Sequence, residues 1–182
     1  MSQFITDIEK IRSQAKKSLD DGAVTDANES KVKSVIALLD AALATEWICV
    51  LRYSQHSVTA TGIYAETIAE HFAEHAQEEL EHAHWLAKRI QQLGGVPHLD
   101  PAHLVNSAHS YYAECNSLLD MIKENLIAER IAIISYTEMI RSVGESDPTS
   151  RRLFEKILEV EEEHADDLAS LLDSANPTMP LH

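Results

Sequence analysis

The stretch that decides the fold is residues 61–93, TGIYAETIAEHFAEHAQEELEHAHWLAKRIQQL. It has the apolar spacing of a long amphipathic helix and contains two Glu-x-x-His pairs, Glu79 with His82 and Glu81 with His84. At about 100° per residue, Glu79 lies in the middle of the apolar stripe and His82 lies at its edge. Glu81 and His84 fall on the opposite face. We therefore expect the first pair in the core and the second in water or against a neighbouring subunit.

A buried glutamate at position 79 needs a cationic partner. Burying an ionised carboxylate without a cationic partner costs several kcal/mol of free energy, unless the group takes up a proton. No lysine or arginine shares the stripe of Glu79. We expect a metal cation to compensate the charge.

The same arrangement occurs three more times. In residues 148–175, Glu161 is at the centre of the apolar stripe and His164 is at its edge. In residues 31–60 the stripe is centred on Glu46, and in residues 112–143 it is centred on Glu129. Glu124 faces about 140° away from Glu129 and is excluded by the same periodicity. Four helices are thus predicted to direct one glutamate each into a common core.

The spacing of these residues indicates an internal repeat. Glu46 and Glu129 are 83 residues apart, and Glu79 and Glu161 are 82 residues apart. Each glutamate without a histidine has a tyrosine seven residues later, namely Tyr53 and Tyr136. A duplicated helical hairpin explains this regularity better than coincidence.

Six residues carry a resemblance to a known family: Glu46, Glu79, His82, Glu129, Glu161 and His164. The set resembles the di-iron ligands of the ferritin-like superfamily, whose helix bundles hold metals between facing carboxylates and histidines. The likeness spans roughly residues 31–175 and is greatest to bacterioferritins and Dps-like mini-ferritins. It implies an all-α, ferritin-like four-helix bundle with a complete site within one subunit.

The resemblance also implies a role for each residue. Glu46 and His82 would bind one iron, Glu129 and His164 would bind the other, and Glu79 and Glu161 would bridge them. Such a set suits two Fe per subunit, and it also tolerates Mn or Zn.

Two positions depart from particular members of the family. Leu80 stands where bacterioferritins carry a haem-ligating methionine, so no haem is expected. Ile131 stands where archaeal Dps-like proteins carry a cysteine.

Composition narrows the class of protein. A chain of 182 residues with 45% hydrophobic content has room for one full core. Its net charge of −15 disfavours nucleic acid and anionic membranes and attracts metal cations. Residues 1–33 carry no basic excess that could bind DNA. Two cysteines and no apolar leader predict a cytoplasmic protein, and apolar stretches such as Trp47–Leu51 are too short to cross a membrane.

Three parts are expected along the chain: an N-terminal amphipathic helix and linker in 1–28, the bundle in 29–175, and a short tail in 176–182. The first helix should cover residues 3–20 and dock on another surface. Asn28 or Ser30 is expected to cap the first bundle helix, and Asp147 the fourth. A long crossover between the second and third bundle helices would let both start at the same end of the bundle.

Apolar residues also lie off the core stripes. Trp47, Ile48 and Leu51 on the first bundle helix, and Ile127, Ile131 and Ile134 on the third, predict subunit contacts. The tail, with Pro177 and Pro180, is too short for the fifth helix that the resemblance associates with shells of 24 subunits. We therefore expect a homo-oligomer, and a dodecameric shell in particular.

Several other residues keep more than one interpretation. We expect His56, His71, His75 and His84 to be solvated or at interfaces, although His75 could serve metal entry or support a ligand. Tyr53 and Tyr136 are expected to donate to ligand carboxylates, with a redox role as the alternative. Cys49 and Cys115 are expected to be buried apolar residues.

The resemblance implies oxidation of Fe(II) by oxygen or peroxide, followed by storage of Fe(III) in a protein shell. Two alternatives stay open: a di-metal oxidoreductase such as a hydroxylase or manganese catalase, and a structural bundle with a vestigial site. Sequence does not distinguish oxygen from peroxide, iron from manganese, or one iron entry channel from another.

Overall fold

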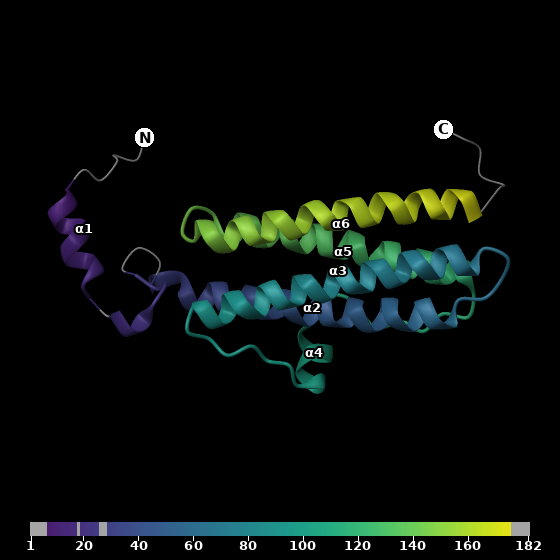
Figure 1. Ribbon diagram of the computed structural model, residues 1–182, viewed down its shortest axis with the longest axis horizontal. Coiled ribbons are helices and arrows are strands. Elements are labelled where there is room, and N and C mark those ends of the chain that lie inside the picture. Colours follow the sequence, from purple (N-terminus) through teal and green to yellow (C-terminus); the bar gives the residue numbers. More distant parts are fainter. Residues whose placement is uncertain (1–6, 18, 26–28, 176–182) are drawn as a thin grey trace.

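Four long helices make up the body of the protein in a computed structural model that describes residues 7–17, 19–25 and 29–175. They are α2 (Val32–Thr59), α3 (Ala65–Gln92), α5 (Leu118–Val143) and α6 (Pro148–Ala175), and they run lengthwise beside one another (Figure 1). The prediction of an all-α, ferritin-like four-helix bundle is confirmed. The tail 176–182 and Asn28 lie outside the described residues.

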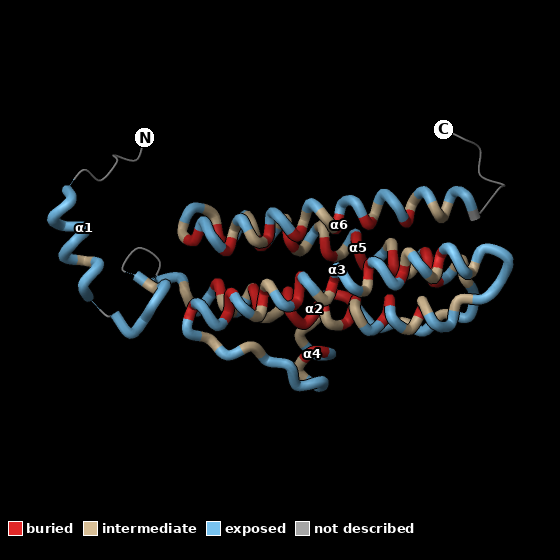
Figure 2. Tube along the Cα trace, in the orientation of Figure 1, coloured by how far each residue is buried: buried red, intermediate tan, exposed pale blue. Residues whose placement is uncertain are grey.

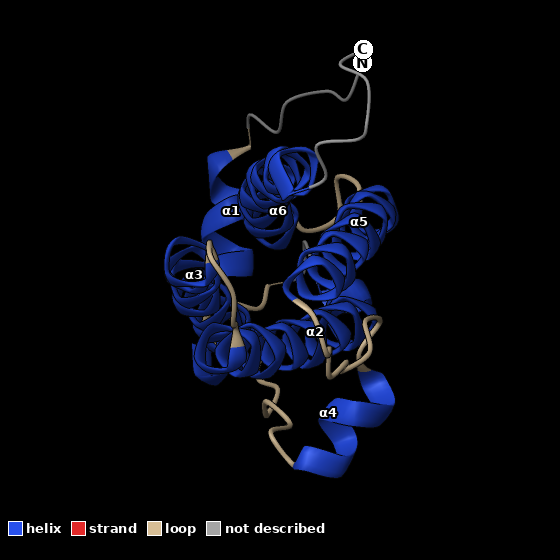
Figure 3. Ribbon diagram, turned by 90° about the vertical axis from the view of Figure 1, so that its right-hand side faces the viewer, coloured by secondary structure: helices blue, strands red, loops and turns tan. Residues whose placement is uncertain are grey.

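The bundle consists of two helical hairpins joined by a crossover. Helix α2 packs against α3, and α5 packs against α6. The connection from Leu93 to Ser117 contains the short helix α4 (Pro101–Ser107), which the sequence did not predict. This connection runs beside α2 and returns the chain to the end of the bundle where α3 began (Figures 1 and 3). Helices α3 and α5 are therefore parallel, as the long crossover predicted.

Local capping chemistry sets most helix ends. The carboxylate of Asp147 accepts the backbone N–H of Ser150 at 3.0 Å, as expected for the cap of α6. Gly144 ends α5 with a φ of 54°, a conformation that glycine adopts without strain. Ser117 caps α5, so this helix starts later than the predicted residue 112.

The expected side-chain cap of α2 by Ser30 is wrong. The N-cap residue of α2 is Lys31, and no side-chain hydrogen bond caps this end. A 3-10 turn, Glu29–Lys31, leads into the helix instead.

Two apolar clusters fill the bundle, one toward each end, and the buried residues face inward from all four helices (Figure 2). Leu43, Ala83, Ala132 and Ile157 belong to the first cluster. Cys49, Phe72, Ile122 and Leu168 belong to the second. The four core glutamates lie between these positions on their respective helices, so the polar residues occupy the middle of an otherwise apolar core.

The N-terminal segment differs from its prediction. Helix α1 covers Ile8–Ala15, and a 3-10 turn follows at Leu19–Asp21, where a single helix over residues 3–20 was predicted. Residues 3–6 and 18 lie outside the described part of the chain. Helix α1 stands off the end of the bundle and has no buried residue, with Ile8 55% exposed (Figure 1). The expected docking of this helix is therefore not seen on its own chain.

One segment, Glu29–Thr59, is long and apolar enough to cross a membrane by length and composition. This differs from the expectation that no apolar stretch would be long enough. Half of its most apolar window is buried in the bundle, and Glu46 and Arg52 are among the buried residues of α2. A bundle core helix passes the same test, so the membrane interpretation of this segment is weak.

Candidate metal centre

The structure brings together all six residues that the sequence singled out, one or two from each long helix. Their ligand atoms form two groups within which all atoms lie inside 4.8 Å of one another. The first group is Glu46, Glu79, His82 and Glu161, and the second is Glu79, Glu129, Glu161 and His164. Glu79 and Glu161 belong to both groups. The arrangement is thus two adjacent four-residue positions with two shared carboxylates.

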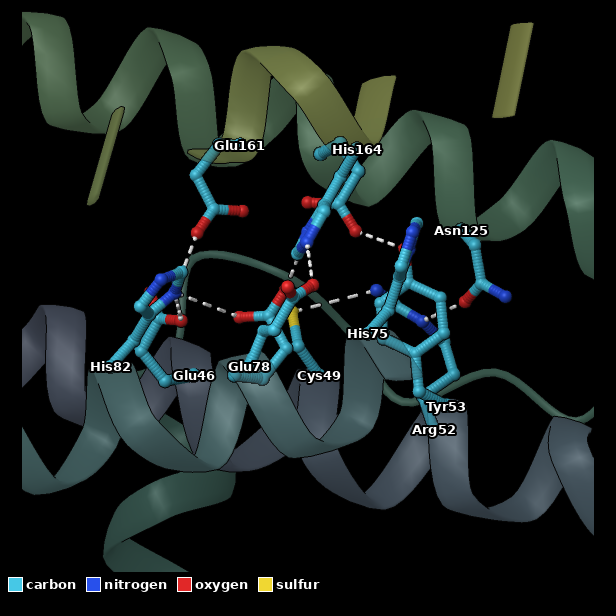
Figure 4. Close-up of polar contacts among 12 residues, drawn as sticks. Glu46, Cys49, Arg52, Tyr53, His75, Glu78, His82, Asn125, Glu161 and His164 are labelled. Carbon is cyan, nitrogen blue, oxygen red and sulfur yellow. Dashed lines mark hydrogen bonds and ion pairs between the residues drawn. The ribbon is translucent and has the colours of Figure 1, made fainter. Parts of the chain in front are cut away.

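Both histidines present Nδ1 to the carboxylates. Nδ1 of His82 lies 3.0 Å from Oε1 of Glu161, 3.4 Å from Oε2 of Glu46 and 3.7 Å from Oε2 of Glu79. Nδ1 of His164 lies 3.3 Å from Oε1 of Glu79. In Figure 4, Glu161 and His164 descend from one side of the centre, while Glu46 and His82 rise from the other. The donors converge on the space between the two hairpins.

The centre holds polar atoms that the protein does not satisfy. Among the described residues, seven buried side-chain nitrogen and oxygen atoms have no hydrogen-bond partner, and all seven belong to the six residues of the centre. Both carboxylate oxygens of Glu79 are among them. Each unpaired buried polar atom costs about 1–3 kcal/mol. Such a concentration of unpaired polar atoms is what a site for a bound metal ion would leave when no metal is present.

Without metal, protons compensate the charge. Burial and the charge of Glu79 raise the pKa values of Glu46, Glu129 and Glu161. Burial would also raise the pKa of Glu79, but contacts with Glu46, His164 and His82 outweigh it and lower that pKa well below 4.5.

The two histidines complete this balance. Burial disfavours both imidazolium ions, but hydrogen bonding to Glu46 and Glu79 raises the pKa of His82 to about 10. Contacts with Glu79 and Glu129 raise the pKa of His164 to about 9. In the metal-free protein the ionised Glu79 therefore lies between two imidazolium ions. Metal ions would displace these protons, so metal binding should release protons.

Two tyrosines support the carboxylates across the bundle. The hydroxyl of Tyr53 on α2 donates to Glu129 on α5, and the hydroxyl of Tyr136 on α5 donates to Glu46 on α2. The expectation that both tyrosines bond a core carboxylate is confirmed. The reciprocal pattern also follows the predicted repeat, because each hairpin supplies the same two side chains to the other. Each bond occupies one carboxylate oxygen and leaves the second free to face the centre.

Glu78 and His75 support His164, and the sequence did not assign Glu78. Glu78 on α3 accepts a hydrogen bond from Nε2 of His164 at 2.7 Å, which leaves Nδ1 for the centre. The ring of His75 stacks on the ring of His164 at 3.9 Å, and its Nδ1 lies 3.2 Å from the hydroxyl of Tyr53. His75 is buried, so the expectation of a solvated histidine is wrong there, whereas its alternative role as support for a ligand agrees with these contacts.

A buried polar network beside the centre was also missed. Arg52 donates to Oδ1 of Asn125 at 2.9 Å, to Oγ of Ser110 at 3.0 Å and to the carbonyl of Tyr111 at 3.0 Å. Asn125 bonds His56, whose other ring nitrogen lies 3.1 Å from the carbonyl of Ala113. His56 is therefore buried rather than solvated. The network ties the crossover to α2 and α5.

The predicted exposure or burial of the remaining residues is confirmed for some and wrong for others. Glu81 and His84 are exposed as predicted, and Cys49 is buried. Cys115 is only partly buried, because it lies in the crossover rather than in the bundle. Ile48 is buried although a free surface was expected for it.

The donor set fits divalent metal ions. Four carboxylates and two imidazoles form the mixed oxygen and nitrogen environment that iron, manganese and zinc accept. Two divalent cations would balance four carboxylate charges, and all seven unpaired buried atoms belong to the six residues of the centre. No lysine or arginine among the described residues forms an ion pair with these four glutamates.

Comparison with known proteins agrees with this geometry. Residues 36–176 match the family model of the ferritin-like domain. The "DNA protection during starvation protein" of Pyrococcus furiosus is 32% identical over 136 residues, which cover 73% of this chain and 74% of that protein. The "Nutrient stress-induced DNA-binding protein" of a Synechococcus species is 31% identical over 141 residues, which cover 74% and 78%.

A solved structure extends the comparison. The dodecameric thioferritin of Bacteroides fragilis, a bacterioferritin-related protein, is 34% identical with a TM-score of 0.76, over 79% of this chain and 87% of that one. Residues 36–176, which match the family model, contain all six residues of the centre. The chain belongs to the family of proteins with a ferritin-like domain.

Proposed function

We propose that this protein is a ferroxidase that oxidises Fe(II) with oxygen or hydrogen peroxide and stores the Fe(III) product in a protein shell. The observation that carries the proposal is the pair of overlapping donor groups that share Glu79 and Glu161, together with their unpaired buried atoms. Two cations held side by side can deliver two electrons to one oxidant molecule.

The six residues of the centre would bind iron, and the two tyrosines would orient their carboxylates. Glu46 and His82 would hold one Fe(II), Glu129 and His164 the other, and Glu79 and Glu161 would contact both. Bound iron supplies the electrons: two Fe(II) and two protons convert one hydrogen peroxide into two waters, leaving two Fe(III). Tyr53 and Tyr136 would keep their carboxylates oriented, because each hydroxyl bonds one carboxylate oxygen and leaves the other unpaired.

Acidic and apolar residues on the surface support the proposal that iron is stored in an assembly of subunits. Exposed carboxylates on α6 line an open hollow and would attract cations: Glu159, Glu162, Glu163, Asp166 and Asp167. Ile127 and Ile134 are exposed on α5, and Leu51 is exposed on α2, which provides apolar surface for subunit contacts. We propose a dodecamer, in keeping with the dodecameric relative at 34% identity. We also propose a cytoplasmic location, where its two free cysteines would stay reduced.

The alternative function is a di-metal oxidoreductase acting on an organic substrate. Such an enzyme needs a cleft that reaches the metal centre. A hollow of about 300 Å³ is lined by Tyr64, Thr67, Ile68, Leu171 and Ser174, and another is lined by Ile48, Leu51 and Val105, among others. Neither contains any of the six residues of the centre. The separation of both hollows from the centre supports iron, rather than an organic molecule, as the substrate.

The names of two relatives mention DNA, but this chain lacks the basic excess that DNA binding needs. Its net charge is −15, and residues 1–33 hold equal numbers of basic and acidic side chains. We propose that it does not bind nucleic acid. An electrophoretic mobility assay with duplex DNA at low salt tests this, and a retarded complex that disappears as salt rises would contradict it.

Anaerobic titration with Fe(II), followed by exposure to oxygen or peroxide, tests the proposed function. We expect two Fe(II) to bind per chain, to oxidise rapidly, and to be followed by further iron that accumulates as a mineral inside the assembly. Two ions per chain without mineral growth would favour the oxidoreductase. Binding of fewer than two ions would contradict the two-ion centre.

A further inference from the structure

A second group of metal-binding side chains lies outside the bundle core, where the crossover passes α2. It consists of Asp40 on α2, His98 in the crossover and His103 on α4, with ligand atoms within 4.8 Å of one another. Nε2 of His103 lies 2.7 Å from Oδ2 of Asp40. Nδ1 of His98 lies 3.2 Å from Oδ1 of the same carboxylate. The two imidazole rings meet edge to face, with centroids 5.0 Å apart.

Local structure holds these three residues in place. Asp100 caps α4 by accepting the backbone N–H groups of Ala102 and His103, which positions His103 in the first turn. The backbone N–H of His98 also approaches Asp40, at 3.4 Å. Among the described residues, His98 and His103 are the only ion-pair partners of Asp40. One carboxylate thus faces two imidazoles that come from a segment about sixty positions away in the sequence.

We propose that Asp40, His98 and His103 bind a single divalent transition-metal ion of the Zn²⁺ class, and that this ion fastens the crossover to α2. Two imidazoles and one carboxylate form a donor set that such ions accept, with further positions left open to water. Ligands of a tetrahedral ion with bonds of about 2.0 Å lie about 3.3 Å apart. The two histidine nitrogens lie 3.2 Å and 2.7 Å from the Asp40 carboxylate, and all three donors lie within 4.8 Å of one another. Small side-chain adjustments therefore suffice to admit the ion.

This position is separate from the centre in the core. Asp40 precedes Glu46 by six residues, which corresponds to about 9 Å along the helix axis and about 120° around it. The side chain of His98 is 59% exposed and that of Asp40 is 15% exposed, so the group opens to solvent whereas the six core residues are buried. The inference therefore does not rest on the proposed ferroxidase activity, and either can fail without the other.

The test compares Zn²⁺ binding by the full-length protein and by variants. His98→Ala/His103→Ala should bind one Zn²⁺ fewer per chain than the unmodified protein, as measured by titration calorimetry and metal analysis after gel filtration. Asp40→Asn keeps the size of the side chain, and should weaken that same ion at least about tenfold, since even groups that only support ligands cost this much when removed. His109→Ala is the matched control, because His109 is an exposed crossover histidine that contacts the bundle through its backbone N–H.

Two direct measurements complete the test. Crystals grown with Zn²⁺ should show anomalous scattering between Asp40, His98 and His103 above the zinc absorption edge. Zn²⁺ should also slow proteolysis within residues 93–117 in the unmodified protein and in His109→Ala, but less in His103→Ala. Equal Zn²⁺ stoichiometry in all variants, or core scattering without any at this group, would overturn the proposal. Binding here without slower proteolysis would overturn the fastening role.

Discussion

A substitution at Glu79 distinguishes the role of the core centre from that of the exposed acidic surface. Glu79→Gln keeps the shape of the side chain but removes the charge shared by both donor groups. Glu79 is 0% exposed, neither of its oxygens accepts a hydrogen bond, and its ion pairs are to His82 and His164 of the same centre. We expect this substitution to impair both metal positions at once.

The size of the effect follows from the position of Glu79. Removing a group that only supports a metal ligand costs about 10–100-fold in affinity or activity. Glu79 belongs to both four-residue groups, so its loss should cost at least the upper end of that range, about 100-fold or roughly 2.7 kcal/mol. Glu81→Gln is the matched control, because Glu81 is exposed two residues away on the same helix. Its effect should stay within about 0.5 kcal/mol.

The assay is the initial rate of Fe(II) oxidation followed by stopped-flow absorbance, with Fe(II) binding measured separately under anaerobic conditions. Circular dichroism of both variants checks that the bundle is intact. Equal rates for Glu79→Gln and Glu81→Gln, in folded proteins, would refute the assignment of Glu79 to the centre. A normal Fe(II) stoichiometry in Glu79→Gln would refute its role as a shared ligand.

Three further predictions concern stability, haem and assembly. Asp147→Asn should destabilise the protein by about 3 kcal/mol at neutral pH, because it leaves the buried Arg89 without its carboxylate partner. Burial would raise the pKa of Asp147, but bonds from Ser150 and Arg89 lower it, so the loss should shrink as pH falls below about 4 in chemical denaturation. Visible spectra should show no Soret band after haem reconstitution and gel filtration, since Leu80 offers no ligand atom. Native mass spectrometry should give about 244 kDa for twelve chains of 20.3 kDa, and about 487 kDa would contradict the dodecamer.

The sequence predicted the bundle and the six core residues because both depend on local periodicity. A glutamate in the middle of an apolar stripe is visible from 3.6-residue spacing alone, as for Glu79 and Glu161. Each such residue points inward once its helix packs, whatever the detailed crossing angles are. The placement of Tyr53 and Tyr136 followed from the same spacing.

The residues that were missed depend on the crossover. Arg52 lies about 120° from Glu46 around α2, on a face that periodicity assigns to solvent. In the structure it is buried, and it donates to Ser110 and Tyr111 of the crossover. Ile48 is buried near the same connection, where it lines a hollow with Val105 of α4. The crossover is largely irregular, so no periodicity predicts its path. The burial of residues beneath it could therefore not be predicted from the sequence.

The internal repeat explains both the symmetry of the core centre and the place where that symmetry ends. The two hairpins supply equivalent glutamates, histidines and tyrosines, so each of the two donor groups contains three carboxylates and one imidazole. The spacing of 82 residues, however, relates Glu78 to Val160 and His75 to Ile157. His164 therefore bonds a carboxylate whose side chain is 52% exposed, while the ring of His82 lies beside Trp85, 5.3 Å away between centroids. The two halves of the predicted repeat thus share their donors and differ in their surroundings: His164 has a polar connection to the surface, and His82 has an aromatic neighbour.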